Sequence, residues 1–300
     1  MNVTVGIPVY NEEKNIQKLL KSLALQEGIF IEKTIIVNDG STDKTLAKIT
    51  ELDYHIKTKI NMEIINLSVN KGKPHALNLI FKRACSDYLV LLDSDVQLMN
   101  TKTLKILLEP FIREGNVGLV CGWFEVEPTR NACADLFKRA FRFSSLLRKE
   151  IALKAKDVYG AIGAIMALSR DVYSTLEIPE NTIRDDAYVY LWTISKGKKF
   201  IFNPKAKVKL ITQFNSLKHF LMRYAKGSSI SKELTENFGK NVRRHLSCPP
   251  LFTLLPLFVK TLAHAPADGI CYCALRGIYF LYGRIFNFNI SSKWRCSDET

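Results

Sequence analysis

The sequence predicts an α/β fold with a mostly parallel central sheet and helices on both of its faces. Two observations support this prediction. Short β-rich apolar runs alternate with helical patterns along the first hundred residues, and a polar cluster follows each apolar run. Strands that alternate with helices are typical of parallel sheets. With 300 residues, of which 47% are hydrophobic, the chain can bury a sizeable core.

The first predicted strand is Val3–Val9, which alternates and is rich in β-branched residues. A helix is expected to follow it. Asn11 is expected to cap that helix, with Glu12 and Glu13 in its first turn, where acidic side chains favour the positive end of the helix dipole.

The next predicted elements are strands at Thr34–Val37, Met62–Leu67 and Asp87–Leu92, with a helix at Pro74–Ala84 before the last of them. In open α/β sheets, ligands bind at the carboxyl ends of the strands. The polar clusters after these strands are therefore expected at one edge of the sheet, where they define a binding site.

The formal net charge of +14 implies an acidic partner, such as nucleotide phosphates, anionic lipid or nucleic acid. Much of it lies in residues 196–244, which hold 13 Lys and Arg against two Glu. No known nucleic-acid motif and no aromatic interleaving accompany this charge. A nucleic-acid-binding protein is therefore only a remote alternative, and we expect no nucleic-acid partner.

Seven cysteines are scattered along the chain without a CxxC pair. An odd, scattered set predicts buried free thiols in a reducing compartment, not a disulfide framework or a zinc site.

The C-terminal part has two apolar segments, Leu251–Leu262 and Ile270–Phe286. The longest uncharged run, Leu246–Val259, has 14 residues and three prolines, whereas a spanning helix needs about 20 apolar residues. No signal peptide is expected at the amino terminus. The segments are therefore expected to be helices lying in a membrane interface, with basic residues beside them, as a peripheral protein on the cytoplasmic face. An ordinary core-packing helical tail is the alternative.

The pair Asp93 and Asp95 directly follows an apolar strand. Two carboxylates at this spacing can share a hard cation, which prefers oxygen ligands. Such a cation can neutralise the charge of a leaving diphosphate. An Asp-x-Asp alone is common on protein surfaces.

Three further motifs precede this pair in order, at Ile7–Glu13, Val37–Asp43 and Asn70–Asn78. As an ordered set they resemble family 2 of the GT-A glycosyltransferases, which includes polysaccharide synthases and polyprenyl-phosphate sugar transferases. The resemblance covers about residues 3–227. It implies a Rossmann-like GT-A fold and inverting transfer from a nucleotide sugar, with Mn²⁺ or Mg²⁺.

The resemblance also implies roles for the donor-side residues. Asp39 would accept a hydrogen bond from the base, usually uracil, although an Asp-Gly pair also forms turns. Lys73 would lie near the base or the diphosphate, although a solvated lysine at a helix start is an alternative. The nucleotide pocket would be lined by Pro8, Tyr10, Asn11 and Glu12. Lys71 would lie beside Lys73. Asp93 would contact the ribose and the metal, and Asp95 would bind the metal.

On the acceptor side, Gly160–Leu168 resembles the family's small-residue stretch beneath the acceptor, and a buried strand explains the same composition. Asp185 and Asp186 match the family's Glu-Asp pair, with Asp in place of Glu. The resemblance makes Asp186 the catalytic base. Paired acids tend to raise one pKa, which suits a base. The pair can also cap a helix over Ala187–Ser195.

The last motif, Phe220–Gly227, resembles the family's Gln-x-x-Arg-Trp, with Phe220 and Tyr224 in place of Gln and Trp. Arg223 still fits a diphosphate contact. Processive synthases carry the intact motif and several spanning helices, so this sequence favours transfer of a single sugar.

These patterns predict a GT-A catalytic domain over residues 1–215, with a nucleotide-sugar half over about 1–100 and an acceptor half over about 101–215. A basic helical segment and interfacial helices are expected over 216–300. The predicted activity is metal-dependent transfer of a hexose from a UDP-sugar to a hydroxyl of a lipid-linked or membrane-proximal glycan. A polyprenyl-phosphate sugar synthase is the alternative.

Overall fold

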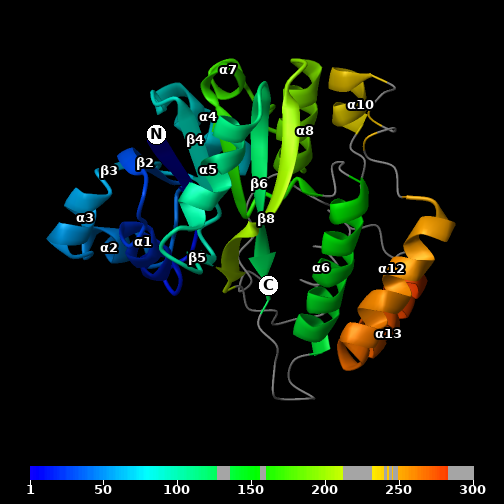
Figure 1. Cartoon of the computed structure of the whole chain (residues 1–300). Coiled ribbons are helices and arrows are strands. Elements are labelled where there is room, and N and C mark those ends of the chain that lie inside the picture. Colours follow the sequence, from blue (N-terminus) through cyan, green and yellow to red (C-terminus); the bar gives the residue numbers. More distant parts are fainter. Residues whose placement is uncertain are drawn as a thin grey trace. The chain divides into compact units, whose positions relative to one another are not determined.

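The structure, a computed structural model, describes residues 1–126, 136–155, 160–211, 232–239, 242, 245 and 249–282. Its described residues fall into two compact units (Figure 1). The sheet unit comprises residues 1–124 and 161–211, and the helical unit takes its residues from 125–160 and 212–291.

The sheet unit is built on an eight-stranded sheet with the order β3-β2-β1-β4-β7-β6-β8-β5. Strands β3, β2, β1 and β4 are parallel, whereas β7 is antiparallel to both β4 and β6, and β5 is antiparallel to β8. The strands are β1 Asn2–Val9, β2 Phe30–Asn38, β3 Met62–Asn66, β4 Tyr88–Leu92, β5 Val96–Leu98, β6 Val117–Glu125, β7 Ile165–Ser169 and β8 Lys199–Leu210.

The helices of the sheet unit cover both faces of its central strands. From Val3 to Val9 every residue of β1 is buried, so neither face of this strand meets water. A Cβ added at Gly6 would lie 2.4 Å from the side chain of Ile80. The absence of a side chain at Gly6 therefore lets Ile80 of α4 pack closely against β1. The helices are α1 Ile16–Ala24, α2 Thr45–Thr50, α3 Tyr54–Lys59, α4 Lys73–Arg83, α5 Thr103–Arg113, α7 Arg170–Tyr173 and α8 Asp185–Ser195.

The mixed α/β architecture and the four predicted strands are confirmed, as is the predicted helix after the third of them. The predicted cap at Asn11 is wrong. Helix α1 begins at Ile16 and has no acidic residue in its first turn, so Glu12 and Glu13 precede it. Asn11 instead adopts φ 51°, and its Oδ1 accepts a hydrogen bond of 2.8 Å from the backbone N–H of Thr42. Asn tolerates this left-handed conformation, so the chain turns toward the neighbouring loop before the helix starts.

The helical unit contains α6 Leu136–Ala155, α10 Lys232–Phe238, α12 Leu251–His264 and α13 Pro266–Tyr282. Helix α6 packs against α12 and α13, and the ring of Phe143 lies between Phe258 and Tyr272 at centroid distances of 5.4 and 5.1 Å. The buried carboxylate of Asp268 pairs with both Arg139 and Arg142. The two apolar C-terminal segments are therefore helical, as predicted, up to Tyr282.

The grouping of α6 with the C-terminal helices was not anticipated from the sequence, in which α6 falls within the predicted acceptor half. The predicted boundary at residue 215 lies outside the described residues. None of the helices in the described ranges is long and apolar enough to cross a membrane.

The described cysteines are free thiols. Cys121 is buried, as predicted, but the prediction of burial is wrong for Cys85 and Cys273, which are exposed.

Candidate active site

The loops that follow β1 and β2 are joined by hydrogen bonds at the carboxyl edge of the sheet. The backbone N–H groups of residues 11–13 donate to side chains of the second loop, at distances of 2.7–3.2 Å, and the acceptors are Ser41, Thr45 and Asp43. This edge therefore consists of loops that hold one another, as expected from the parallel strands beneath them.

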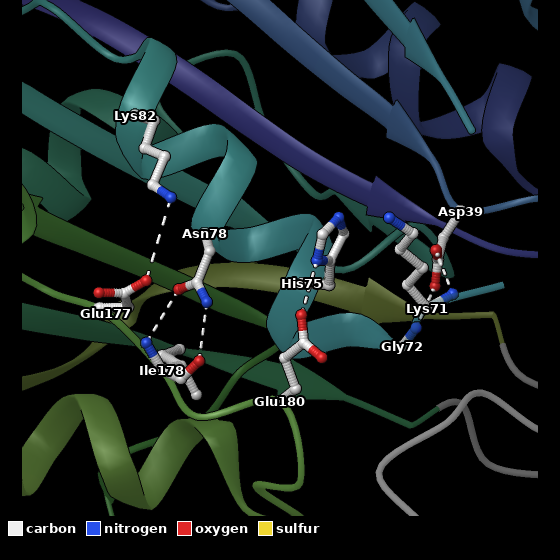
Figure 2. A network of polar contacts seen from close by, with 9 residues as sticks. All are labelled: Asp39, Lys71, Gly72, His75, Asn78, Lys82, Glu177, Ile178 and Glu180. Carbon is white, nitrogen blue, oxygen red and sulfur yellow. Dashed lines mark hydrogen bonds and ion pairs between the residues drawn. The ribbon is translucent and has the colours of Figure 1, made fainter. Parts of the chain in front are cut away.

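Asp39 is fully buried and fixes the loop after β3. Its Oδ1 accepts from the backbone N–H of Lys71 at 2.8 Å, and its Oδ2 accepts from Gly72 at 2.7 Å (Figure 2). Gly40 has φ 69°, and a Cβ there would lie 2.4 Å from the backbone of Val69, so the two loops meet without space for a side chain. A carboxylate offers about four acceptor positions, and these two bonds use two of them.

Helix α4 begins beside this loop because Gly72, at φ 101°, precedes it and Pro74 lies in its first turn. Its first residue, Lys73, has its Nζ 2.7 Å from Asp93 Oδ1 and 3.0 Å from Asp185 Oδ2. Burial opposes the charged ammonium, but the carboxylates of Asp185 and Asp93 more than offset it, so the pKa of Lys73 lies above its usual value. The alternative of a solvated lysine is wrong for Lys73.

Asp185 and Asp186 are the first two residues of α8, where acidic side chains stabilise a helix start. Asp186 Oδ1 accepts from the N–H of Ala187 at 2.8 Å. Burial raises the pKa of the Asp185 carboxyl, the charge of Lys73 opposes this, and the charges of Asp186 and Asp93 add to it. The predicted cap is therefore wrong: the pair lies in the first turn of α8, and the N-cap is Arg184, which makes no side-chain capping bond.

Gly163 lies over this charged group. A Cβ at residue 163 would be 3.4 Å from Lys73 Nζ and 3.7 Å from Asp93 Oδ2. The predicted small-residue stretch continues into β7, whose residues 165–168 are buried, so the buried-strand interpretation is confirmed for these residues. A small cavity is lined here by Pro8, Lys73, Asp93, Gly163 and Asp185 together with apolar residues.

Glu12 belongs to the same acidic region. Its pKa is raised to about 7, first by burial and then by the negative charge of Asp95, with a smaller contribution from Asp93, while a hydrogen bond from Asn15 opposes the shift. Within the described ranges, no three His, Cys, Asp or Glu side chains form a ready-made metal cage. The accumulated negative charge around Asp93 and Asp95 nevertheless fits a hard divalent cation that takes its other ligands from phosphates and water.

The other predicted site residues differ in their exposure to solvent. Tyr10 is buried at the end of β1, and Lys71 is exposed. Arg223 lies outside the described residues. His75 and Asn78 belong to the third motif but were not among the predicted site residues, and both contact the loop before α8.

Comparisons with known proteins find similar glycosyltransferases. A poly-beta-1,6-N-acetyl-D-glucosamine synthase of Staphylococcus epidermidis is 34% identical over 38% of this chain and 26% of its own length. The poly(ribitol-phosphate) beta-N-acetylglucosaminyltransferase TarS of Staphylococcus aureus is 36% identical over 35% of this chain and 18% of its own length. The matches thus span about a quarter or less of these relatives.

Solved structures share the fold. The mannosyltransferase PcManGT of Pyrobaculum calidifontis, in complex with GDP-Man and Mn²⁺, has a TM-score of 0.56 at 18% identity, covering 94% of this chain and 81% of its own. Glucosyl-3-phosphoglycerate synthase of Mycobacterium tuberculosis, with Mn²⁺ and UDP-glucose, has a TM-score of 0.51 at 15% identity, covering 79% of each chain. The model of the family described as glycosyl transferase family 2 matches residues 4–176, which is more than half of the chain. The chain therefore belongs to glycosyl transferase family 2 and is a glycosyltransferase.

Proposed function

We propose that this glycosyltransferase moves a hexose from a UDP-sugar, with inversion, to a hydroxyl of a lipid-linked or membrane-proximal glycan. One observation carries the proposal. The single ammonium of Lys73 contacts Asp93 at the end of β4 and Asp185 at the start of α8, so a donor-side carboxylate and the neighbour of the proposed base Asp186 line one cavity.

Donor binding is assigned to the loops at the carboxyl edge. The acceptor capacity of buried Asp39 suits a base N–H such as that of uracil. Pro8, Tyr10, Asn11 and Glu12 belong to the adjoining strand end and loop. Lys71 is exposed, and its ammonium can approach a phosphate as a point charge.

Asp93 and Asp95 would hold a divalent cation, which would supply positive charge to the departing diphosphate. Two solved structures of the same fold contain Mn²⁺ with a nucleotide sugar, which supports this choice. Lys73 stays protonated beside Asp93, so it adds fixed positive charge at the same place.

Asp186 is proposed as the general base. It takes the proton of the acceptor hydroxyl as that oxygen forms a bond to the anomeric carbon. The bond from this carbon to the phosphate oxygen breaks, and UDP leaves with the electron pair. Asp185 is held by Lys73 and keeps the start of α8 in place.

A second candidate is transfer to a polyprenyl phosphate, which the basic residues of 196–244 favour. A phosphate acceptor is already ionised and needs less base catalysis, so loss of the Asp186 carboxylate would then have little effect on turnover.

Attachment to an anionic membrane is proposed for the helical unit. Helix α12 exposes Leu251, Phe252, Leu255 and Val259, which recur along the helix at a spacing that places them on one face. The adjoining basic stretch would add electrostatic attraction to anionic lipid.

A thermal-shift screen of nucleoside diphosphates and nucleotide sugars with Mn²⁺ tests the proposed donor. A ligand at 100 times its Kd stabilises the folded protein by about 2.7 kcal/mol. UDP and one or more UDP-sugars are expected to raise the melting temperature only with Mn²⁺. A larger shift with GDP than with UDP would contradict the proposed base.

A further inference from the structure

One face of α4 holds the loop that leads into α8. His75, Asn78 and Lys82 recur at the three- and four-residue spacing that places side chains on one side of a helix. Figure 2 shows all three directed toward residues 177–180. The opposite end of this loop continues into Asp185 and Asp186.

Asn78 makes the strongest of these contacts. Its Nδ2 donates to the carbonyl of Ile178 at 2.7 Å, and its Oδ1 accepts from the N–H of Ile178 at 2.9 Å. One side-chain amide therefore satisfies both backbone groups of a residue that is itself 1% exposed. Since an unpaired buried backbone group is unfavourable, this pair fixes the position of Ile178.

The two flanking contacts differ in strength. His75 Nδ1 lies 3.1 Å from Glu180 Oε1, and His75 is mostly covered. Lys82 Nζ lies 3.9 Å from Glu177 Oε1, and both of these side chains are at least 70% exposed. The Lys82 pair is screened by water and contributes little.

The loop of residues 177–184 is short and contains its own hydrogen bond. Fixing the position of Ile178 therefore also determines where α8 begins. The N–H of Thr182 donates to the carbonyl of Pro179 at 3.0 Å, and Thr182 is buried. The same helix α4 starts at the loop held by Asp39, and its Lys73 contacts Asp185. Helix α4 thus touches the nucleotide loop at one end and the acceptor-side loop along its face.

We propose that Asn78 is a positioning residue, supported by His75, that holds the loop of residues 177–184 so that Asp185 and Asp186 face the site at Lys73. This inference rests on the proposed role of Asp186 as the base. It assigns to the third motif a function on the acceptor side, separate from donor binding.

The kinetic test compares Asn78→Ala with Lys82→Ala, a matched removal of a weak contact from the same helix face. Affinity for UDP with Mn²⁺ is measured by calorimetry, and turnover is measured as UDP release from the UDP-sugar that the wild type uses fastest. Asn78→Ala is expected to keep the Kd for UDP within about twofold and to lose about 10- to 100-fold in kcat, since small displacements in active sites have such effects. Lys82→Ala should keep both. A kcat of Asn78→Ala within threefold of wild type, or a loss confined to UDP affinity, would overturn the proposal.

Hydrogen exchange tests the positioning without turnover, so it separates this proposal from the proposed function. In Asn78→Ala, amides of residues 177–187 should exchange faster than in the wild type, while those of residues 62–72 should not change. Unchanged exchange at 177–187 would overturn the proposal even if the enzyme is active. If Asn78→Ala does not fold, the isosteric Asn78→Asp and the exposed-site variant Glu180→Ala replace it. Both should accelerate exchange in the same segment, and wild-type exchange in both would overturn the proposal.

Discussion

The ammonium of Lys73 lies 3.0 Å from Asp185, so the first residue of α4 contacts the first residue of α8. The same ammonium lies 2.7 Å from Asp93, which follows β4. The start of α4, the end of β4 and the start of α8 therefore meet at one positive charge. Removing that charge would leave two partly buried carboxylates facing each other, which gives the contact measurable consequences.

Lys73→Met is expected to lower the free energy of unfolding by about 1–3 kcal/mol at neutral pH, because two carboxylates lose their counter-charge. Without Lys73, burial raises the pKa of Asp185 further above its value in the unfolded chain. The contribution of Asp185 to the variant's stability is then full below about pH 4 and is lost as pH rises through the raised pKa. Urea unfolding of both proteins at pH 5 and pH 8 measures this difference. An equal loss at the two pH values would contradict the electrostatic account of Lys73.

Asp95→Asn should leave the fold intact and abolish the metal dependence of UDP binding, because the amide is a poor substitute for a carboxylate on a hard cation. Calorimetric titration of UDP with and without Mn²⁺ measures it. Asp87→Asn, at the opposite end of β4, is a suitable control and should bind as the wild type does. Wild-type metal dependence in Asp95→Asn would remove this residue from the metal site.

Glu12 predicts a pH dependence of stability in the metal-free protein. Its folded-state pKa of about 7 lies above the ordinary value of 4.5. The protonated form is therefore favoured by folding, and its contribution is full below about pH 4.5 and is lost as pH rises through 7. Glu12→Gln should flatten the fall in melting temperature between pH 5 and pH 8, whereas Glu51→Gln, at the exposed C-cap of α2, should not. An unchanged profile in Glu12→Gln would show that the Glu12 carboxyl does not titrate there.

Membrane attachment through α12 predicts that Phe252→Ser combined with Leu255→Ser weakens co-sedimentation with anionic liposomes severalfold, because the variant exposes less apolar area to the bilayer. Tyr54→Ser is the control, since Tyr54 is a comparably exposed aromatic residue on α3 of the sheet unit. Binding should also require anionic lipid, weaken with salt and largely disappear on truncation after Arg244. A full-length protein that stays in the supernatant at low salt would contradict attachment.

The strands and the edge at which their loops gather could be predicted because apolar runs and Gly- or Asp-rich turns are local patterns. The residues at which helices begin were harder to predict from the sequence. Asn11 has the composition of a cap, but hydrogen bonds to residues 41–45 hold its loop, and that partner is thirty residues away.

The contacts that define the candidate site were not predictable for the same reason. Lys73 looked like a solvated residue or a phosphate ligand, since nothing near it in sequence identifies Asp185 as its partner. Asn78 and Ile178 are one hundred residues apart. The grouping of α6 with the C-terminal helices likewise depends on packing between distant segments.

The most direct test of the account is the comparison of Asp186→Asn with wild type in UDP binding and in sugar transfer. A positioned general base contributes about 10²–10⁴-fold. The variant should therefore bind UDP with Mn²⁺ as the wild type does, yet lose transfer by a factor in that range. Asp185→Asn serves as the neighbouring control. A turnover of Asp186→Asn within a few-fold of wild type, or the full loss in Asp185→Asn alone, would contradict the assignment of the base.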